Sequence, residues 1–440
     1  MTNRLLRIHA QLDDLTSSPW SDDVLELTLG VALSLRVSEA DESALVWLMI
    51  VGPPSDGKTA TVLLLKTAQG VYCVDTVTEN FLASGYRDEK TGKSAPDLFK
   101  ELDGRCVIIK EFGTVLSLRA DKVRKFLGDL QAIYDREYSK ATGTVGTVRG
   151  KAAFSIVACV TPATLHEHQQ YMARIGPRFL MYRAPELTEA QEDDGLEMFW
   201  EATHETRKKV LVELRQLVAE HLAECLNRPL TPTPETPAEK TFINRLAKLV
   251  ACGRTDIRWQ KSHDDITGRD RYDLEISQVE KPFRVQQQLR NLGRSLALVH
   301  GRDHLTEHEL ELLRRVALSS LPADRAAVMA LFPDHAEGLT AGACGAAIGK
   351  SDDRARQILE ELVLIKLLVR RSGKSQGGAP ATVYGPVPRI ADFLTIGFEP
   401  LDHVVDLMGS FTDKSDTLER EGLSGQSYRQ SQDAAQGVEP

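Results

Sequence analysis

The residues best suited to chemistry lie in one short stretch, ALVWLMIVGPPSDGKTATVLL, at positions 44–64. An apolar run leads into Gly52, and the triplet Gly57, Lys58 and Thr59 follows after four further residues. This is the spacing of a phosphate-binding P-loop between a strand and a helix. Glycines let successive backbone N–H groups turn inward toward an anion. We therefore predict that this segment binds the phosphates of a nucleotide.

Each polar residue of this loop has an expected effect. Lys58 would reach the β- and γ-phosphates, and the Thr59 hydroxyl would bind Mg²⁺, which prefers oxygen ligands. The carboxylate of Asp56 would repel phosphate unless it points to solvent, so it is expected to weaken affinity. ATP and Mg²⁺ are the expected cofactors. The predicted nucleotide-binding residues of the loop are Gly52, Ser55, Asp56, Gly57, Lys58, Thr59 and Ala60.

The composition fits a soluble protein with two to four domains. The chain has 440 residues, of which 42% are hydrophobic and 27% charged, with a formal net charge of −9. This mild acidity argues against a protein that coats nucleic acid indiscriminately, but it permits local basic patches. Six scattered cysteines without CxxC pairs predict a reducing cytoplasm, no disulfides and no zinc. No apolar run has the length of a membrane span, and no signal peptide is expected.

Alternating apolar and helix-compatible segments predict an α/β fold with a mostly parallel sheet. The strand before the P-loop is followed by four more strand-like runs, at 71–75, 105–109, 154–160 and 179–182. Five such strands are similar to an AAA+ or RecA-like ATPase core. We assign this core to residues 1–203, with an N-terminal helix at 22–36.

Three further regions follow this predicted core. Residues 204–322 are expected to form a helical lid and linker, with 240–322 entirely helical; the capping-box spacing of Thr306 and Glu309 starts one of its helices. Residues 323–390 combine three short helices with a Gly-rich hairpin, which is the order of a winged helix. The polar residues 391–440 are expected to be a disordered tail.

Three residues outside the loop are candidates for catalysis. Glu111 follows the apolar run 106–109 and could hold the Mg²⁺ shell or polarise water, although Lys110 stands where a second acid is usual. Thr161 ends a predicted strand and could position water, or it could simply cap the next element. Arg178, with Arg174 as a substitute, could act as an arginine finger on a neighbouring subunit, or it could be a solvated surface residue.

In the order of its motifs, the chain resembles AAA+ ATPases of the helix-2-insert group. These motifs are the P-loop, the Walker B strand before Glu111, the hairpin at 138–152, the strand that ends in Thr161 and Pro162, the stretch GPRF at 176–179, and the helical segment that follows. Minichromosome-maintenance-like helicases of phages and mobile elements are the nearest comparison, over residues 44–322. The resemblance implies that the hairpin at 138–152 grips DNA in a ring channel. It also implies that Arg284 acts as sensor 2 at the γ-phosphate. The cations available on the hairpin are Lys140, Arg149 and Lys151.

The predicted winged helix has a basic cluster of its own. Arg354 and Arg356 would lie on a recognition helix that enters a major groove. Arg370, Arg371 and Lys374 would lie on the wing and hold phosphates. A winged helix can also be a protein–protein module, and that alternative stays open.

The sequence favours an ATP-driven DNA helicase or translocase that forms a homo-oligomer, a hexameric ring, on single-stranded or forked DNA in phage or mobile-element replication. The main alternative is a non-translocating ATP switch, namely a helicase loader or a transcriptional regulator. A defence-system ATPase is a third possibility. A cytoplasmic location without membrane contact is expected in each case.

Overall fold

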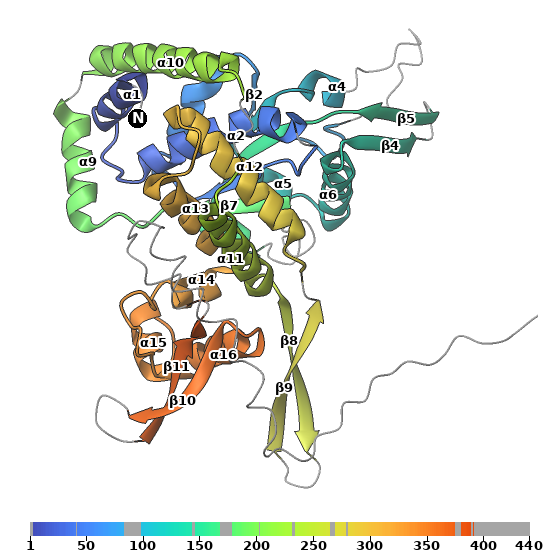
Figure 1. Cartoon of the computed structure of the whole chain (residues 1–440), viewed down its shortest axis with the longest axis vertical. Coiled ribbons are helices and arrows are strands. Elements are labelled where there is room, and N and C mark those ends of the chain that lie inside the picture. Colours follow the sequence, from blue (N-terminus) through green and yellow to red (C-terminus); the bar gives the residue numbers. More distant parts are fainter. Residues whose placement is uncertain are drawn as a thin grey trace, which may run out of the picture. The chain divides into compact units, whose positions relative to one another are not determined.

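The computed structural model describes residues 3–40, 42–82, 98–142, 146–167, 178–201, 203–230, 234–264, 269–278, 280–374, 380–388 and 390. Figure 1 shows their arrangement. The tail predicted to be disordered, 391–440, lies outside these ranges, and so does Arg174. Within the described residues, no helix combines the length and the apolar character that crossing a membrane requires.

A five-stranded parallel sheet forms the centre of the fold, which confirms the predicted α/β class. Its strands lie in the order β2-β3-β6-β1-β7. β1, β3 and β6 are buried along their whole length. Burial on both faces explains why these segments read as continuous apolar runs rather than alternating ones. The bounds are β1 (Trp47–Val51), β2 (Val71–Val74), β3 (Cys106–Ile109), β6 (Ser155–Val160) and β7 (Phe179–Arg183).

Alternate residues of each strand point to opposite faces, so the sheet separates two hydrophobic clusters. Leu48 and Ile50 pack into one cluster, and Trp47 and Met49 into the other. Trp47 anchors its cluster because its indole N–H donates to the Phe154 carbonyl at 2.9 Å. The sheet is therefore fixed from both sides, which holds its strand ends in place.

Helices surround the sheet (Figure 1). One cluster includes residues of α1 (Asn3–Asp13), α2 (Ser21–Ala40), α10 (His204–Asn227), α11 (Pro237–Gly253), α12 (Phe283–His300) and α13 (Glu307–Ser319). The other includes residues of α4 (Leu98–Leu102), α5 (Phe112–Leu116), α6 (Ala120–Tyr134) and α7 (Pro162–Glu167). α9 (Glu189–Glu201) precedes α10. The predicted capping box at Thr306 and Glu309 is confirmed at the start of α13.

Two antiparallel hairpins lie between these helices in the sequence. β4 (Glu137–Thr142) and β5 (Gly146–Lys151) pair antiparallel where a hairpin was expected. β8 (Asp256–Asp264) and β9 (Arg269–Gln278) also pair antiparallel, so the prediction that 240–322 is entirely helical is wrong. Alternation of apolar and polar residues along 256–259 and 273–276 favours strands. Opposite charges also face each other at Arg258 and Glu275.

The segment after α13 has the element order expected for a winged helix. α14 (Ala323–Met329), α15 (Ala341–Ile348) and α16 (Asp352–Leu364) precede an antiparallel hairpin of β10 (Leu368–Lys374) and β11 (Pro380–Pro386). Ser351 is the N-cap of α16, where its hydroxyl accepts from the Arg354 N–H at 3.3 Å. Membership of a winged-helix family stays a prediction.

Candidate functional site

The predicted P-loop begins at the carboxyl end of β1, between β6 and β7. Gly52 continues the strand and donates its N–H to the Val160 carbonyl at 3.2 Å. Gly57, with φ of 90°, is the N-cap of α3 (Lys58–Val62), and this left-handed backbone favours glycine. Ligands of parallel α/β sheets bind outside the carboxyl ends of the strands. The loop therefore lies at the edge of the sheet where a nucleotide site is expected.

The Asp56 carboxylate lies inside this loop rather than pointing to solvent. Its Oδ1 accepts the Lys58 backbone N–H at 3.1 Å and lies 3.2 Å from the Lys58 ammonium. Its Oδ2 lies 2.1 Å from the position that a Cβ on Gly52 would take. The Asp56 side chain is only 6% exposed. The donors predicted to hold phosphate thus already hold an anion from the chain itself.

Lys58 is turned into the loop as well. Its ammonium donates to the Pro53 carbonyl at 2.6 Å, and its side chain is only 8% exposed. The helix that follows is short, because α3 gives way to the 3₁₀ turn η1 (Leu63–Thr67). The dipole of so short a helix adds little positive potential at the loop.

Cys159 on β6 lies beside the predicted P-loop, and its thiol forms a hydrogen bond with Thr59. Burial is the main reason why the pKa of this thiol is raised to about 12. The Lys58 charge and a hydrogen bond with Thr59 oppose that shift, while the charges of Asp56 and Glu111 add to it. Glu111 follows β3 and the loop with Thr59 follows β1, so both leave the same edge of the parallel sheet, with β6 between them.

Glu111 itself is exposed and follows β3 as the N-cap of α5. Its backbone N–H donates to the Asp75 carbonyl at 3.1 Å, which fixes the strand end. The neighbouring Lys110, whose presence in place of an acid was unexpected, forms an ion pair with the Asp75 carboxylate. Lys110 is therefore drawn towards β2, and the Glu111 carboxylate is left facing solvent at the end of the sheet.

Thr161 ends β6 as predicted, but its hydroxyl has local partners. It lies 2.9 Å from the Thr164 hydroxyl and accepts the Thr164 N–H at 3.4 Å. These are contacts of a residue that caps the following helix, α7. A role in positioning water stays a prediction.

Arg178 and Arg284 lie together at the opposite end of the sheet from the P-loop. The guanidinium carbons stand 5.6 Å and 5.8 Å, respectively, from the centre of the Tyr134 ring. The Tyr134 hydroxyl donates to the Leu45 carbonyl at 2.8 Å, before β1 begins. β1 spans five residues, a length of about 16 Å. The structure therefore does not bring Arg284 to the P-loop of its own chain, where the sensor 2 expectation placed it.

Tyr134 was missed in the sequence because it reads as an ordinary core residue at the end of a helix. Its ring supports both arginines, and Gln288 of α12 reinforces the position by donating to the Arg178 carbonyl at 2.7 Å. Burial and the Arg284 charge lower the pKa of Arg178. A paired, partly desolvated cation of this kind is suited to meeting an external anion.

The hairpin cations differ in availability. Lys140 on β4 forms an ion pair with Asp129 of α6, and its side chain is 17% exposed. Arg149 and Lys151 on β5 are exposed, and Lys151 lies 3.2 Å from Glu137. The prediction that Lys140 contacts DNA therefore meets a competing partner that the sequence did not reveal.

The cations of the C-terminal segment are also partly paired. Arg354 lies 2.6 Å from Asp324, and Arg356 lies 3.8 Å from Asp353. Arg370 forms an ion pair with Glu360, which also accepts the Tyr384 hydroxyl at 2.7 Å. Arg371 is exposed, and the Lys374 side chain lies outside the described residues.

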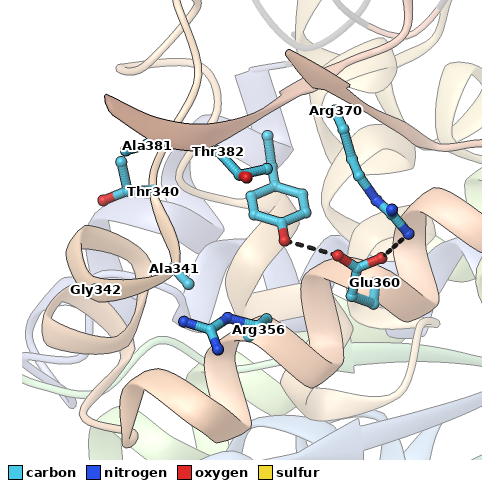
Figure 2. Close-up of a pocket in the computed structure, with 9 residues that line it drawn as sticks. Thr340, Ala341, Gly342, Arg356, Glu360, Arg370, Ala381 and Thr382 are labelled. Carbon is cyan, nitrogen blue, oxygen red and sulfur yellow. Dashed lines mark hydrogen bonds and ion pairs between the residues drawn. The ribbon is translucent and has the colours of Figure 1, made fainter. Parts of the chain in front are cut away.

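Figure 2 shows a cavity of about 420 Å³ between α15, α16 and the hairpin, whose lining includes Arg356, Glu360 and Arg370. Arg356 extends from α16 towards the start of α15, while Arg370 reaches from β10 to Glu360. Inside the cavity, Glu360 thus holds Arg370 by an ion pair. The surface offered to DNA phosphates is smaller than the count of basic residues suggested.

No model of a known protein family matches this chain, and no curated protein matches it. The case for a function therefore depends on the geometry of these residues.

Proposed function

We propose that this chain is an ATP-binding and hydrolysing AAA+ protein that works as a DNA helicase or translocase in phage or mobile-element replication. The observation that carries the proposal is the P-loop, in which the Lys58 ammonium and backbone N–H hold a carboxylate at the carboxyl end of β1. An anion held by these donors supports a site built for phosphate.

The residues present fit ATP with Mg²⁺. The inward-facing Oδ2 of Asp56 is a buried oxygen with no hydrogen-bond partner in the described part of the chain. A phosphate group bound through the Lys58 donors would displace this carboxylate. Thr59 and Glu111 would hold Mg²⁺, which would neutralise charge on the phosphates. Glu111 would then polarise water from its exposed position.

The arrangement of the arginines supports shared sites between subunits. Arg178 and Arg284 are presented away from the P-loop of their own chain, so a second copy would have to supply the phosphate that they meet. Phe283, beside Arg284, is 74% exposed. A large exposed aromatic next to a cation pair is typical of an interface. A closed homo-oligomer such as a hexameric ring would use this surface repeatedly.

The switch alternative is favoured by one specific observation. Because Asp129 engages Lys140, the hairpin has less free positive charge than a strand-gripping element needs. In that case the C-terminal helices and hairpin would carry the DNA contacts, and ATP would change their accessibility. A helicase loader or transcriptional regulator would work in this way.

The deciding experiment measures the ATPase rate with and without single-stranded DNA, for wild type and Lys58→Ala. The motor predicts hydrolysis that single-stranded DNA strongly stimulates, and unwinding of a forked duplex. Lys58→Ala should lose nucleotide binding, because the loop loses its charged donor. A slow rate that DNA leaves unchanged would contradict the motor and favour the switch. Equal nucleotide binding by wild type and Lys58→Ala would contradict the nucleotide site itself.

The hairpin makes a separate prediction about salt dependence. Arg149→Ala combined with Lys151→Ala should reduce the slope of log K against log salt for single-stranded DNA by about 1.4, since two phosphate contacts are lost. Lys140→Ala is the matched control and should leave the slope unchanged, because Asp129 already neutralises Lys140. Fluorescence anisotropy over a salt series would measure both. The reverse ranking of the two variants would show that Lys140 leaves Asp129 to bind DNA.

A further inference from the structure

A second group of polar side chains gathers away from the P-loop, around the carboxylate of Glu26. Glu26 lies on α2, and His9 on α1 faces it. His300 ends α12, and His308 lies in the first turn of α13. Glu26 and His300 are fully buried, whereas the His308 side chain is 42% exposed. Four segments of the chain thus converge on one acid.

The imidazole nitrogens all point at this carboxylate. Oε2 of Glu26 lies 2.6 Å from His308 Nε2 and 3.1 Å from His300 Nε2. Its Oε1 lies 3.2 Å from His9 Nε2. His9 thus contacts one oxygen of the carboxylate, while the other oxygen faces the imidazoles of His300 and His308. One oxygen of a fully buried carboxylate therefore meets two imidazole nitrogens at once.

The distances suit a small metal ion. The ligand atoms of Glu26, His300 and His308 all lie within 4.8 Å of one another. Metal–ligand bonds of about 2.0–2.1 Å in a tetrahedral site place the ligand atoms roughly 3.3 Å apart. At Glu26 Oε2 the 3.1 Å separation from His300 Nε2 is close to that value, and the 2.6 Å separation from His308 Nε2 would widen by about 0.7 Å on binding.

The surroundings complete such a site. His9 lies between the Asp22 carboxylate, 3.6 Å from its Nδ1, and Glu26 Oε1, 3.2 Å from its Nε2, so it can hold the ligand carboxylate in place from behind. The exposed side chain of His308 gives an ion a route from solvent. Imidazole and carboxylate together favour zinc and similar transition metals, whereas Mg²⁺ prefers oxygen ligands. This donor set is therefore chemically distinct from the predicted Mg²⁺ residues.

We propose that Glu26, His300 and His308 bind one divalent transition-metal ion of the zinc type. The ion joins α2 to the facing ends of α12 and α13, which lie more than 270 residues further along the chain. A link across so long a stretch stabilises the folded chain, because the ligands come together only after folding. The expectation of no zinc came from the scattered positions of the cysteines, and no cysteine takes part in this site.

The test uses the full chain with any affinity tag removed and metal stripped by a chelator, without nucleotide. Zn²⁺ is titrated in competition with a chromophoric chelator, and thermal unfolding is followed with and without Zn²⁺. We expect one Zn²⁺ per chain and a higher Tm on binding. His308→Gln, at a half-exposed position that tolerates change, should weaken Zn²⁺ binding at least about tenfold and remove the Tm shift. Glu26→Gln should do the same.

The matched control is His304→Gln. His304 is exposed in the same turn but lies near Glu239 instead of Glu26, so Zn²⁺ binding should be unchanged. Circular dichroism checks that each variant folds, and His308→Gln keeps the test valid if Glu26→Gln does not. Co²⁺ in place of Zn²⁺ should give a visible absorption band in wild type and His304→Gln only. Wild type that binds Zn²⁺ no more tightly than His308→Gln would overturn the proposal and leave a purely hydrogen-bonded cluster.

Discussion

Replacing Arg178 by alanine is expected to lower kcat for ATP hydrolysis about 10³-fold, the loss typical of an arginine finger. Nucleotide affinity should stay unchanged, because an arginine finger from a neighbouring subunit meets the charge that develops in the transition state. A loss in kcat alone indicates an interaction made only in the transition state. Steady-state ATPase assays and nucleotide titrations on the same preparation would separate the two quantities.

The structure explains why Arg178 can perform this task on a neighbour. Its guanidinium rests on Tyr134 beside Arg284, so its position is set before any partner arrives. Burial and the Arg284 charge already lower its pKa, which means that the cation is incompletely solvated and poorly neutralised. An anion from a second subunit would neutralise the Arg178 charge and take the place of the missing solvent. Preorganised charge of this kind stabilises a transition state most effectively.

A mixing experiment decides whether Arg178 acts between subunits. Lys58→Ala and Arg178→Ala should each be inactive alone, but the mixture should recover activity, because some interfaces then combine an intact Lys58 with an intact Arg178. Arg119→Ala, at an exposed position paired with Asp121, is the control and should keep the wild-type rate. Unchanged hydrolysis by Arg178→Ala, or no recovery on mixing, would contradict the shared site.

The sheet could be predicted from the sequence because its central strands β1, β3 and β6 are buried on both faces and therefore read as apolar runs. The start of α13 could be predicted because the capping box of Thr306 and Glu309 is a local pattern. The hairpin of β8 and β9 was missed, since its strands alternate only over short stretches among many charged residues. Features that depend on a single helix or strand could thus be predicted from the sequence.

Contacts between distant segments could not be predicted. The pairing of Lys140 with Asp129 joins a strand to a helix, and the Tyr134 ring contacts one arginine just before β7 and another on α12. The histidines around Glu26 come from three other helices. In each case the residue types are ordinary, and only the fold brings them together. The loop residues 52–60, by contrast, lie within one short segment, so their spacing could be read from the sequence, while their function stays a prediction.

Asp56→Asn is expected to tighten nucleotide binding roughly tenfold. In the wild type the Asp56 carboxylate holds the Lys58 ammonium and N–H, so a phosphate must first displace this negatively charged side chain. Hydrogen bonds to charged groups contribute about 1.5–3 kcal/mol each, and 1.4 kcal/mol corresponds to tenfold in affinity. Asparagine keeps the shape of the side chain but removes its negative charge. Isothermal titration with ATP would measure the difference.

The salt dependence and a control sharpen this test. If Asp56 competes as an anion, the gain in affinity should shrink as salt rises, since screening weakens both the repulsion and the internal ion pair. Asp121→Asn removes an equal charge from the surface and should leave affinity unchanged, because its side chain is exposed and pairs with Arg119. Weaker binding by Asp56→Asn would mean instead that the carboxylate holds the loop in its binding shape. The sign of the change therefore decides whether Asp56 restrains the P-loop or builds it.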